Sequence, residues 1–244
     1  MPFYEGNKHS RMPGRWRNWV LLAPLAVMLW ACAGPQLQQD FERPEPSYAL
    51  APATTGTLAD IAARIHAANG PEYSGFHLLD GSHESLAWRL ALIDSAVSSI
   101  DVMTYLWYPD ASGRLVLERA VLAAHRGVHV RLVVDDLMTI GQEQLHVDLE
   151  RHPNIEVRLF NPWEKRDLLS RGGEMVAEME RLNTRMHDKL LIADGRAAII
   201  GGRNIGDHYF GLNRDYNFHD LDVLALGEIA QESNGMFDEF WNSE

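Results

Sequence analysis

The stretch RMHDKLLIADGRAAIIGGRN occupies residues 185–204. Two apolar runs flank Asp194-Gly195, a pair typical of tight turns, so we predict a β-hairpin in which the first strand spans residues 185–193. Alternate residues of a strand project from one face, which places His187 and Lys189 side by side in one site. A nucleophilic imidazole beside a cationic phosphate ligand is suited to phosphoryl transfer.

The spacing of the remaining polar residues makes this pattern more specific. Asp194 follows Lys189 after a gap of four residues, and a glycine pair, an arginine and an asparagine follow after a gap of six. We count Asp194 with the catalytic residues, as the one that holds the turn in place rather than one that transfers a proton. Donors to the phosphate are expected from Lys189 and from the set Gly201, Gly202, Arg203 and Asn204. The glycine N–H groups are unshielded by a Cβ atom.

Charge restricts the class of substrate. The chain carries a formal net charge of −12, which disfavours nucleic acid as a partner, because nucleic-acid binding relies on a basic surface. An anionic substrate must therefore be held by a local basic cluster. Residues 181–203 contain five Lys and Arg against two Asp, and this window coincides with the stretch quoted above. A solvated arginine face is the alternative interpretation, but the coincidence favours a binding role.

The amino-terminal region has the layout of an export signal. Basic residues precede an apolar, uncharged stretch over residues 19–32, which ends at Cys32, the single cysteine of the chain. We interpret residues 1–31 as a lipoprotein-type signal peptide, with Cys32 acylated and the protein anchored in the membrane on the periplasmic side of the cell envelope. A single-pass anchor and a plain secretory peptide stay open. Residues 32–56, rich in Pro, Gln and Glu, predict a flexible tether.

The rest of the chain alternates between strand and helix patterns. Residues 57–73 predict an amphipathic lead-in helix, and residues 74–244 predict one α/β domain with a largely parallel or mixed β-sheet flanked by helices on both faces. Sites in such sheets gather at the carboxyl ends of strands. Asp135 and Asp136 follow one predicted strand, where they either line a cleft or begin a turn. Residues 161–184 are interpreted as a loop or lid.

The pattern of His-x-Lys, four residues, Asp, six residues, Gly-Gly-x-Asn resembles the defining motif of the phospholipase D superfamily. The sequence around this motif is similar to bacterial cardiolipin synthases of that superfamily over about residues 74–242. This similarity is carried by Ile100-Asp101-Val102, Tyr105-Leu106-Trp107, Val134-Asp135-Asp136, residues 156–162 and Asp220-Leu221-Asp222-Val223. The resemblance implies a phospholipase D-like fold and transfer of a phosphatidyl group between phospholipids such as phosphatidylglycerol and phosphatidylethanolamine.

The chemistry expected of this site assigns a role to each side chain. Neutral His187 attacks phosphorus and forms a phosphohistidine, while Lys189 and Asn204 stabilise the charge on the phosphate oxygens. A carboxylate must orient the imidazole, and Asp220 matches the acidic position of the resembling family, with Asp222 in reserve. Because imidazole is a nucleophile near neutral pH, we expect no metal and no other cofactor.

One part of the implied mechanism is absent from the sequence. The resembling enzymes use a second histidine, from a second copy of the motif, as the general acid, and no other His-x-Lys occurs in these 244 residues. We expect either the amino-terminal half of a longer enzyme, which we favour, or a homodimer that pairs two copies of the motif. A phospholipase D-type hydrolase and an inactive half-enzyme that serves as a binding module stay open as alternatives.

Overall fold

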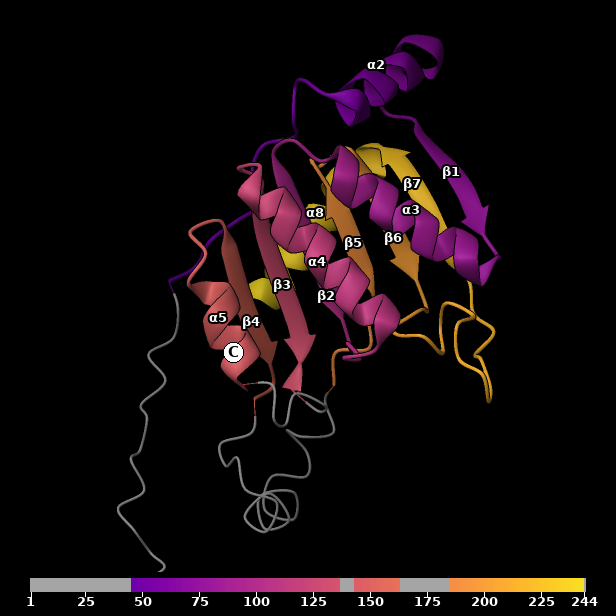
Figure 1. Ribbon diagram of the computed structural model, residues 1–244. Coiled ribbons are helices and arrows are strands. Elements are labelled where there is room, and N and C mark those ends of the chain that lie inside the picture. Colours follow the sequence, from indigo (N-terminus) through magenta and orange to yellow (C-terminus); the bar gives the residue numbers. More distant parts are fainter. Residues whose placement is uncertain (1–44, 137–142, 163–184, 244) are drawn as a thin grey trace, which may run out of the picture. The chain divides into compact units, whose positions relative to one another are not determined.

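Seven strands form one mixed sheet in the computed structural model, which describes residues 45–136, 143–162 and 185–243 (Figure 1). The chain divides into two units, Met1–Glu45 and Pro46–Glu244, and the sheet belongs to the second. Its strands are β1 (Ser74–Leu79), β2 (Ser99–Thr104), β3 (His129–Asp135), β4 (Ile155–Phe160), β5 (Leu190–Ala193), β6 (Ala197–Gly201) and β7 (Asp222–Gly227). They lie in the order β1-β7-β6-β5-β2-β3-β4. Parallel pairing joins β2 to β3 and β3 to β4, and the other neighbours are antiparallel.

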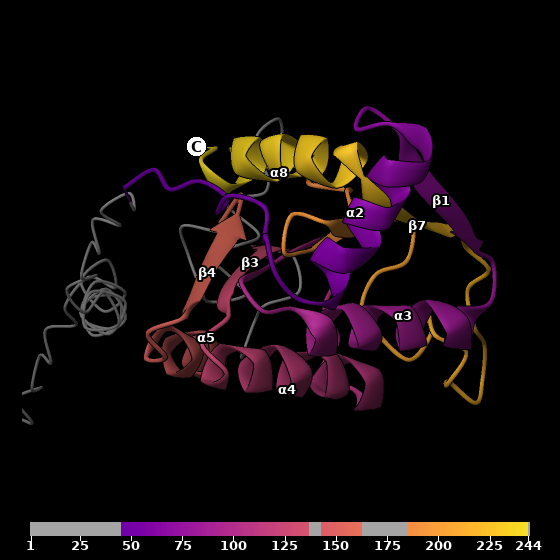
Figure 2. The ribbon, with the colours of Figure 1, turned by 90° about the horizontal axis from the view of Figure 1, so that it is seen from above.

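Helices cover both faces of this sheet, as the sequence predicts. On one face lie α3 (Ser82–Ser95), α4 (Ala111–His125) and α5 (Glu143–Glu150), and on the other lies α8 (Glu228–Trp241) (Figure 2). The lead-in helix, α2 (Thr57–Asn69), contacts β7 and buries Leu58 and Ala62. The mixed sheet and its two helical layers confirm the predicted fold class.

Strand alternation divides the core into two layers. In the central strand β2, Ile100 and Val102 pack toward α3 and α4, whereas Met103 packs toward α8. The α8 layer also contains a buried charge. Arg131 on β3 donates to Asp101 (2.6 Å) and to Asp238 on α8 (2.8 Å), which ties this helix to the sheet.

Part of the predicted tether makes specific contacts. The backbone N–H of Ser47 donates to Asn242 Oδ1 (3.1 Å), that of Ala49 donates to Asp238 Oδ2 (3.0 Å), and that of Ala53 donates to Asp194 O (2.9 Å). The Pro-rich composition predicted a flexible tether, but acceptors on residues distant in the sequence hold this part of it in place.

Residues 1–44, with the predicted signal peptide and Cys32, lie outside the described residues. Among the residues that are described, no helix is long and apolar enough to span a bilayer.

Candidate active site

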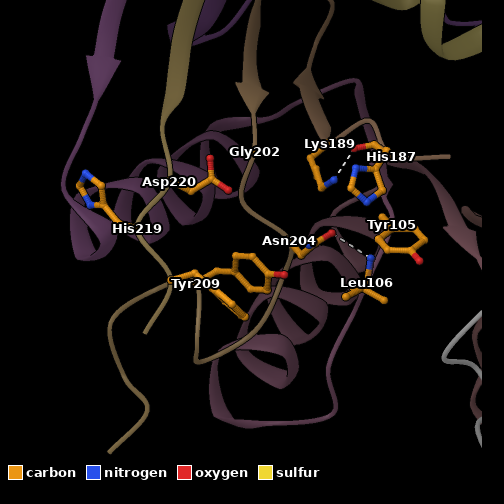
Figure 3. A pocket seen from close by; sticks show the side chains of 10 residues that line it. Tyr105, Leu106, His187, Lys189, Gly202, Asn204, Tyr209, His219 and Asp220 are labelled. Atoms are coloured by element: carbon orange, nitrogen blue, oxygen red, sulfur yellow. Dashed lines mark hydrogen bonds between the residues drawn. The ribbon is translucent and has the colours of Figure 1, made fainter. Parts of the chain in front are cut away.

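A cavity of about 230 Å³ lies at the edge of the sheet where β2 and β6 end and β5 and β7 begin (Figure 3). Because antiparallel neighbours run in opposite directions, four segments far apart in sequence meet at this one edge. The lining residues are Tyr105, Leu106, His187, Lys189, Gly202, Asn204, Tyr209, Phe218, His219 and Asp220. Five of the predicted site residues are therefore brought together: His187, Lys189, Gly202, Asn204 and Asp220.

His187 and Lys189 differ in their exposure. His187 is exposed in the pocket, whereas the Lys189 side chain is buried and its ammonium donates to the His187 carbonyl oxygen. Burial removes water from the ammonium and lowers the pKa of Lys189, an effect that Asp188 and Asp220 partly oppose. The Tyr105 ring lies 5.5 Å from Lys189 Nζ and 4.6 Å from the His187 ring, between centroids. The Lys189 ammonium and the His187 imidazole therefore both lie near the ring of Tyr105.

The segment that carries His187 is not part of the strand. The sequence predicts a strand from residue 185, but β5 begins at Leu190, where its pairing with β2 also begins. Asp135, fully buried at the end of β3, accepts from Arg185 Nη1 (3.1 Å) and from Met186 N (3.3 Å). Asp135 anchors the segment just before His187 and lies outside the cavity lining, which argues against the cleft alternative. The turn alternative involves residues 137–142, which lie outside the described residues.

Asn204 is oriented by its neighbours. Its Oδ1 accepts from Leu106 N (3.0 Å) and faces the Thr104 hydroxyl at 3.5 Å. Because a backbone N–H can only donate, the carboxamide oxygen must face Leu106, and the amide NH₂ is left for the cavity (Figure 3). Asn204 is 4% exposed, so this donor is held in place rather than free to rotate. Lys189 and Asn204 therefore offer two fixed donors beside an exposed imidazole.

The glycine pair has a different role from the predicted one. The Gly201 N–H donates to Lys189 O (3.2 Å) and the Gly202 N–H donates to Leu221 O (3.0 Å), so neither is available to a phosphate. A Cβ atom on Gly202 would overlap the Asp220 carboxylate, and one on Gly201 would overlap Asp222. These glycines allow the close approach of the β7 lead-in, which brings Asp220 to the cavity.

Arg203 does not bind substrate as predicted, because it is 1% exposed and points away from the cavity. Its guanidinium donates to Leu79 O (2.9 Å), Asp80 O (2.6 Å) and Asp222 Oδ2 (3.2 Å). Successive side chains alternate along an extended segment, so Gly202 and Asn204 face the cavity and Arg203 faces the opposite side. The sequence window showed its positive charge but not this direction.

Asp222, the reserve candidate for orienting the imidazole, belongs to the same buried network. It accepts from Arg89 Nη1 (3.0 Å) and Ser85 Oγ (2.5 Å) and has no exposed surface. Burial acts to raise the pKa of Asp222, but the charge and hydrogen bonds of Arg89 and its neighbours outweigh burial, so the pKa is lowered. Asp222 is thus committed to holding Arg89 and Arg203.

Asp220 lies in the cavity across Gly202 from Lys189 and His187 (Figure 3). Its Oδ1 accepts from Leu221 N (2.8 Å), and its charge acts on Lys189. Between the described side chains of Asp220 and His187 there is no direct hydrogen bond, so its role in orienting the imidazole stays a prediction.

Asp194 lies at the other end of β5 and does not line the cavity. Its carboxylate accepts from Val97 N (3.0 Å), Ser98 N (2.7 Å) and Ser99 N (3.1 Å), and its φ of 58° belongs to the turn. These bonds agree with the turn-holding role and remove Asp194 from the catalytic set. It joins the β5–β6 turn to the start of β2.

Five residues of the lining were not predicted as site residues from the sequence: Tyr105, Leu106, Tyr209, Phe218 and His219. Tyr105 follows β2 directly, so the rule that sites gather at strand ends contained a signal for it. His219 precedes Asp220 and is exposed, with its ring turned away from His187 (Figure 3). The predicted lid falls largely in residues 163–184, outside the described residues. Within the described parts, no group of three or more His, Cys, Asp or Glu is placed to hold a metal ion.

Known proteins are similar to the part of the chain that contains this cavity. The family described as "Cardiolipin synthase, PLD-like domain" matches residues 90–241, which contain every residue of the cavity lining. Cardiolipin synthase C of Escherichia coli (strain K12) is 42% identical over 171 residues, or 70% of this chain and 36% of that protein. An uncharacterized protein of Helicobacter pylori (strain J99 / ATCC 700824) is 38% identical over 223 residues, covering 91% of this chain and 44% of that protein. The chain thus spans less than half the length of these relatives.

Among solved structures, NucT from Helicobacter pylori superposes with a TM-score of 0.51 at 17% sequence identity, covering 70% of this chain and 96% of NucT. At this identity the likeness concerns the fold alone.

Proposed function

Because the chain belongs to the cardiolipin synthase-like members of the phospholipase D superfamily, we propose that it forms one half of an enzyme that transfers phosphatidyl groups between phospholipids. The observation that supports this most directly is the grouping of His187, Lys189 and Asn204 around one cavity. A nucleophile is exposed there, and two buried donors stand beside it. That arrangement is suited to a tetrahedral, negatively charged phosphate diester.

The proposed reaction has two steps at phosphorus. In the first, an imidazole nitrogen of His187 forms a bond to phosphorus, the bond from phosphorus to the leaving alcohol oxygen breaks, and that oxygen takes a proton from a general acid. In the second, the hydroxyl of an acceptor phospholipid attacks phosphorus, the P–N bond breaks, and the hydroxyl proton returns to the same acid. With phosphatidylglycerol as donor and acceptor, the products are cardiolipin and glycerol.

The remaining roles follow from this scheme. Lys189 and Asn204 donate to the non-bridging oxygens, and Asp220 is proposed to favour the imidazolium that forms after attack. The general acid is proposed to be a histidine of a second motif, either in the same polypeptide or in a second copy of this chain. Acylation of Cys32 is proposed to hold the site at the membrane on the periplasmic side, which mass analysis of the amino-terminal peptide tests.

The test is incubation of the full-length protein with labelled phosphatidylglycerol, with and without phosphatidylethanolamine. Formation of labelled cardiolipin that is lost in His187→Ala supports the transferase. Phosphatidic acid as sole product supports the alternative, a hydrolase in which water is the acceptor. Absence of any product from correctly folded protein would leave the half-enzyme as a binding module.

A further inference from the structure

The loop between β6 and β7 presents apolar side chains to solvent at the mouth of the cavity. Within ten residues it exposes Leu212 (42%), Tyr216 (56%), Phe218 (43%) and Leu221 (49%). We call these four residues the apolar rim. Single exposed apolar residues are ordinary on protein surfaces, but a cluster beside a polar site indicates an interaction surface.

The rim is held rigidly in the absence of any partner. The ring of Tyr216 stacks on His208 at 4.4 Å between centroids, and the ring of Phe218 lies 4.9 Å from that of Tyr209. The backbone N–H of Phe218 donates to His208 O (2.8 Å). Rigid aromatic side chains lose little conformational freedom on binding, so their burial contributes more fully to affinity.

The apolar rim is connected to the cavity through Phe218 and to the edge of the sheet through Leu221. Phe218 lines the cavity and is also exposed. Leu78 on the edge strand β1 pairs with Val223, two residues after Leu221, so Leu78 and Leu221 lie on the same side of the sheet. Leu78 is 57% exposed and Phe76, on the same face, is 65% exposed. Exposed apolar side chains therefore lie both at the cavity mouth and on the edge strand of the sheet.

We propose that the apolar rim inserts into the boundary between head groups and acyl chains of a phospholipid bilayer, and so holds the cavity at the level of the phosphates. This inference rests on the proposed phospholipid substrate. A phosphodiester bound at Lys189 and Asn204 has its acyl chains outside the polar cavity, where the rim offers them apolar contact. The chain carries a net charge of −12, so an anionic bilayer repels its surface as a whole, and apolar contact must attract the cavity side in addition to the proposed acylation of Cys32.

Site-specific fluorescence tests the orientation of the full chain on vesicles. In a Cys32→Ser background, a fluorophore is attached to Leu212→Cys or Tyr216→Cys, and for comparison to Leu122→Cys or Val147→Cys. The comparison positions are equally exposed, at 46% and 47%, but lie on α4 and α5. With phosphatidylglycerol vesicles that carry nitroxide on their acyl chains, we expect quenching at positions 212 and 216 alone.

The comparison positions separate docking through the apolar rim from adsorption of the chain to the vesicle in other orientations. Equal quenching at all four positions, or none at 212 and 216, would overturn the proposal. Lipid-independent shielding of positions 212 and 216 at rising protein concentration would also overturn it, because it would show that a protein surface covers the rim.

Activity offers an independent measurement. We expect Leu212→Ser with Tyr216→Ser to lower the initial rate on vesicles by at least about tenfold, since each large apolar side chain withheld from the bilayer shifts binding by about that factor. Turnover of a short-chain, monomeric phosphatidylglycerol should stay unchanged, and Leu122→Ser with Val147→Ser should change neither rate. An equal loss on both substrates would contradict the role of the rim. If neither substrate turns over in the unmodified protein, the proposed function fails, and the quenching experiment still decides on the rim.

Discussion

At the scale of single residues, the site contains a charge that the fold holds at a cost. Lys189 is 8% exposed, and burial lowers its pKa below the usual value of 10.5. Between the lowered pKa and 10.5, the unfolded chain binds more protons than the folded one, so stability rises with pH across that window. At neutral pH the buried ammonium therefore opposes folding, a cost that fits its proposed role as a phosphate donor.

This predicts opposite effects of Lys189→Met on stability and activity. The variant should have a higher melting temperature than the unmodified protein at pH 7, and the difference should shrink as the pH approaches 10.5. Its transfer rate should fall by about a hundredfold or more, because a donor to the transition state is lost. Thermal unfolding across pH and assays on phosphatidylglycerol check both effects. A less stable variant would show that the ammonium stabilises the fold.

Substitutions of the two aspartates near β7 should also differ in their effects on stability and on activity. Asp222→Asn should lower the free energy of unfolding by about 3 kcal/mol, because it leaves the buried Arg89 and Arg203 without their carboxylate. Asp220→Asn, in the cavity, should lower activity with little loss of stability. Urea denaturation at pH 7 and activity assays distinguish the two, and a stable Asp222→Asn with normal activity would contradict the network described here.

The pH dependence of Asp222 has a defined sign. Its folded pKa is lowered below 3.8, so its contribution to stability is present above 3.8 and is lost as pH falls through the folded value. The difference in the free energy of unfolding between the unmodified protein and Asp222→Asn should therefore become smaller in strong acid. A gap that stays constant down to pH 2 would contradict the lowered pKa.

The residues that meet in this cavity were more predictable from the sequence than their roles. His187, Lys189 and Asn204 follow from spacing alone and do meet in one cavity. Arg203 and the N–H groups of the glycines do not reach it, because they already donate to Leu79 O, Lys189 O and Leu221 O. A local pattern shows which groups are present, but not which of them are already hydrogen-bonded.

At the scale of elements, the β5–β6 hairpin was predictable and its beginning was not. Asp194-Gly195 and two short apolar runs are local signals, and the turn lies where they predict it. The start of β5 depends instead on Asp135, about fifty residues earlier in the sequence. Its carboxylate accepts hydrogen bonds from Arg185 and Met186, which therefore do not pair with the sheet. That contact leaves His187 exposed in the cavity.

The turn also connects the hairpin to β2 through Asp194. Asp194→Ala should lower the free energy of unfolding by about 3 kcal/mol, because three backbone N–H groups lose their acceptor. Activity per folded molecule should stay near normal, since Asp194 lies outside the cavity. Asp94→Ala is a suitable control: its salt bridge to Arg119 is exposed and should be worth under about 1 kcal/mol. If Asp194→Ala lowered the free energy of unfolding no more than Asp94→Ala does, the anchoring role would be contradicted.

At the scale of the whole molecule, layers were predictable and strand order was not. Apolar periodicity shows that helices cover both faces, but the position of β1 at the edge beside β7 depends on pairing across about 150 residues. A largely parallel or mixed sheet was expected, and the sheet is mixed, with parallel pairing among β2, β3 and β4. The antiparallel remainder is what brings the starts of β5 and β7 to the same edge as the end of β2.

The source of the general acid is a question for the assembled molecule. If two copies of the chain share one active centre, each centre needs His187 from both, as nucleophile and as acid. Equal amounts of the unmodified chain and His187→Ala are mixed with full exchange of subunits. At the same total protein concentration, the mixture should then have about one quarter of the activity of the unmodified chain, because only dimers with two copies of His187 are active. A self-sufficient chain should retain about one half. Activity measured against the mixing ratio, with dimerisation followed by sedimentation, decides between a shared centre and a self-sufficient one. A linear dependence on the unmodified fraction would contradict the shared centre, because it means that a single His187 is enough.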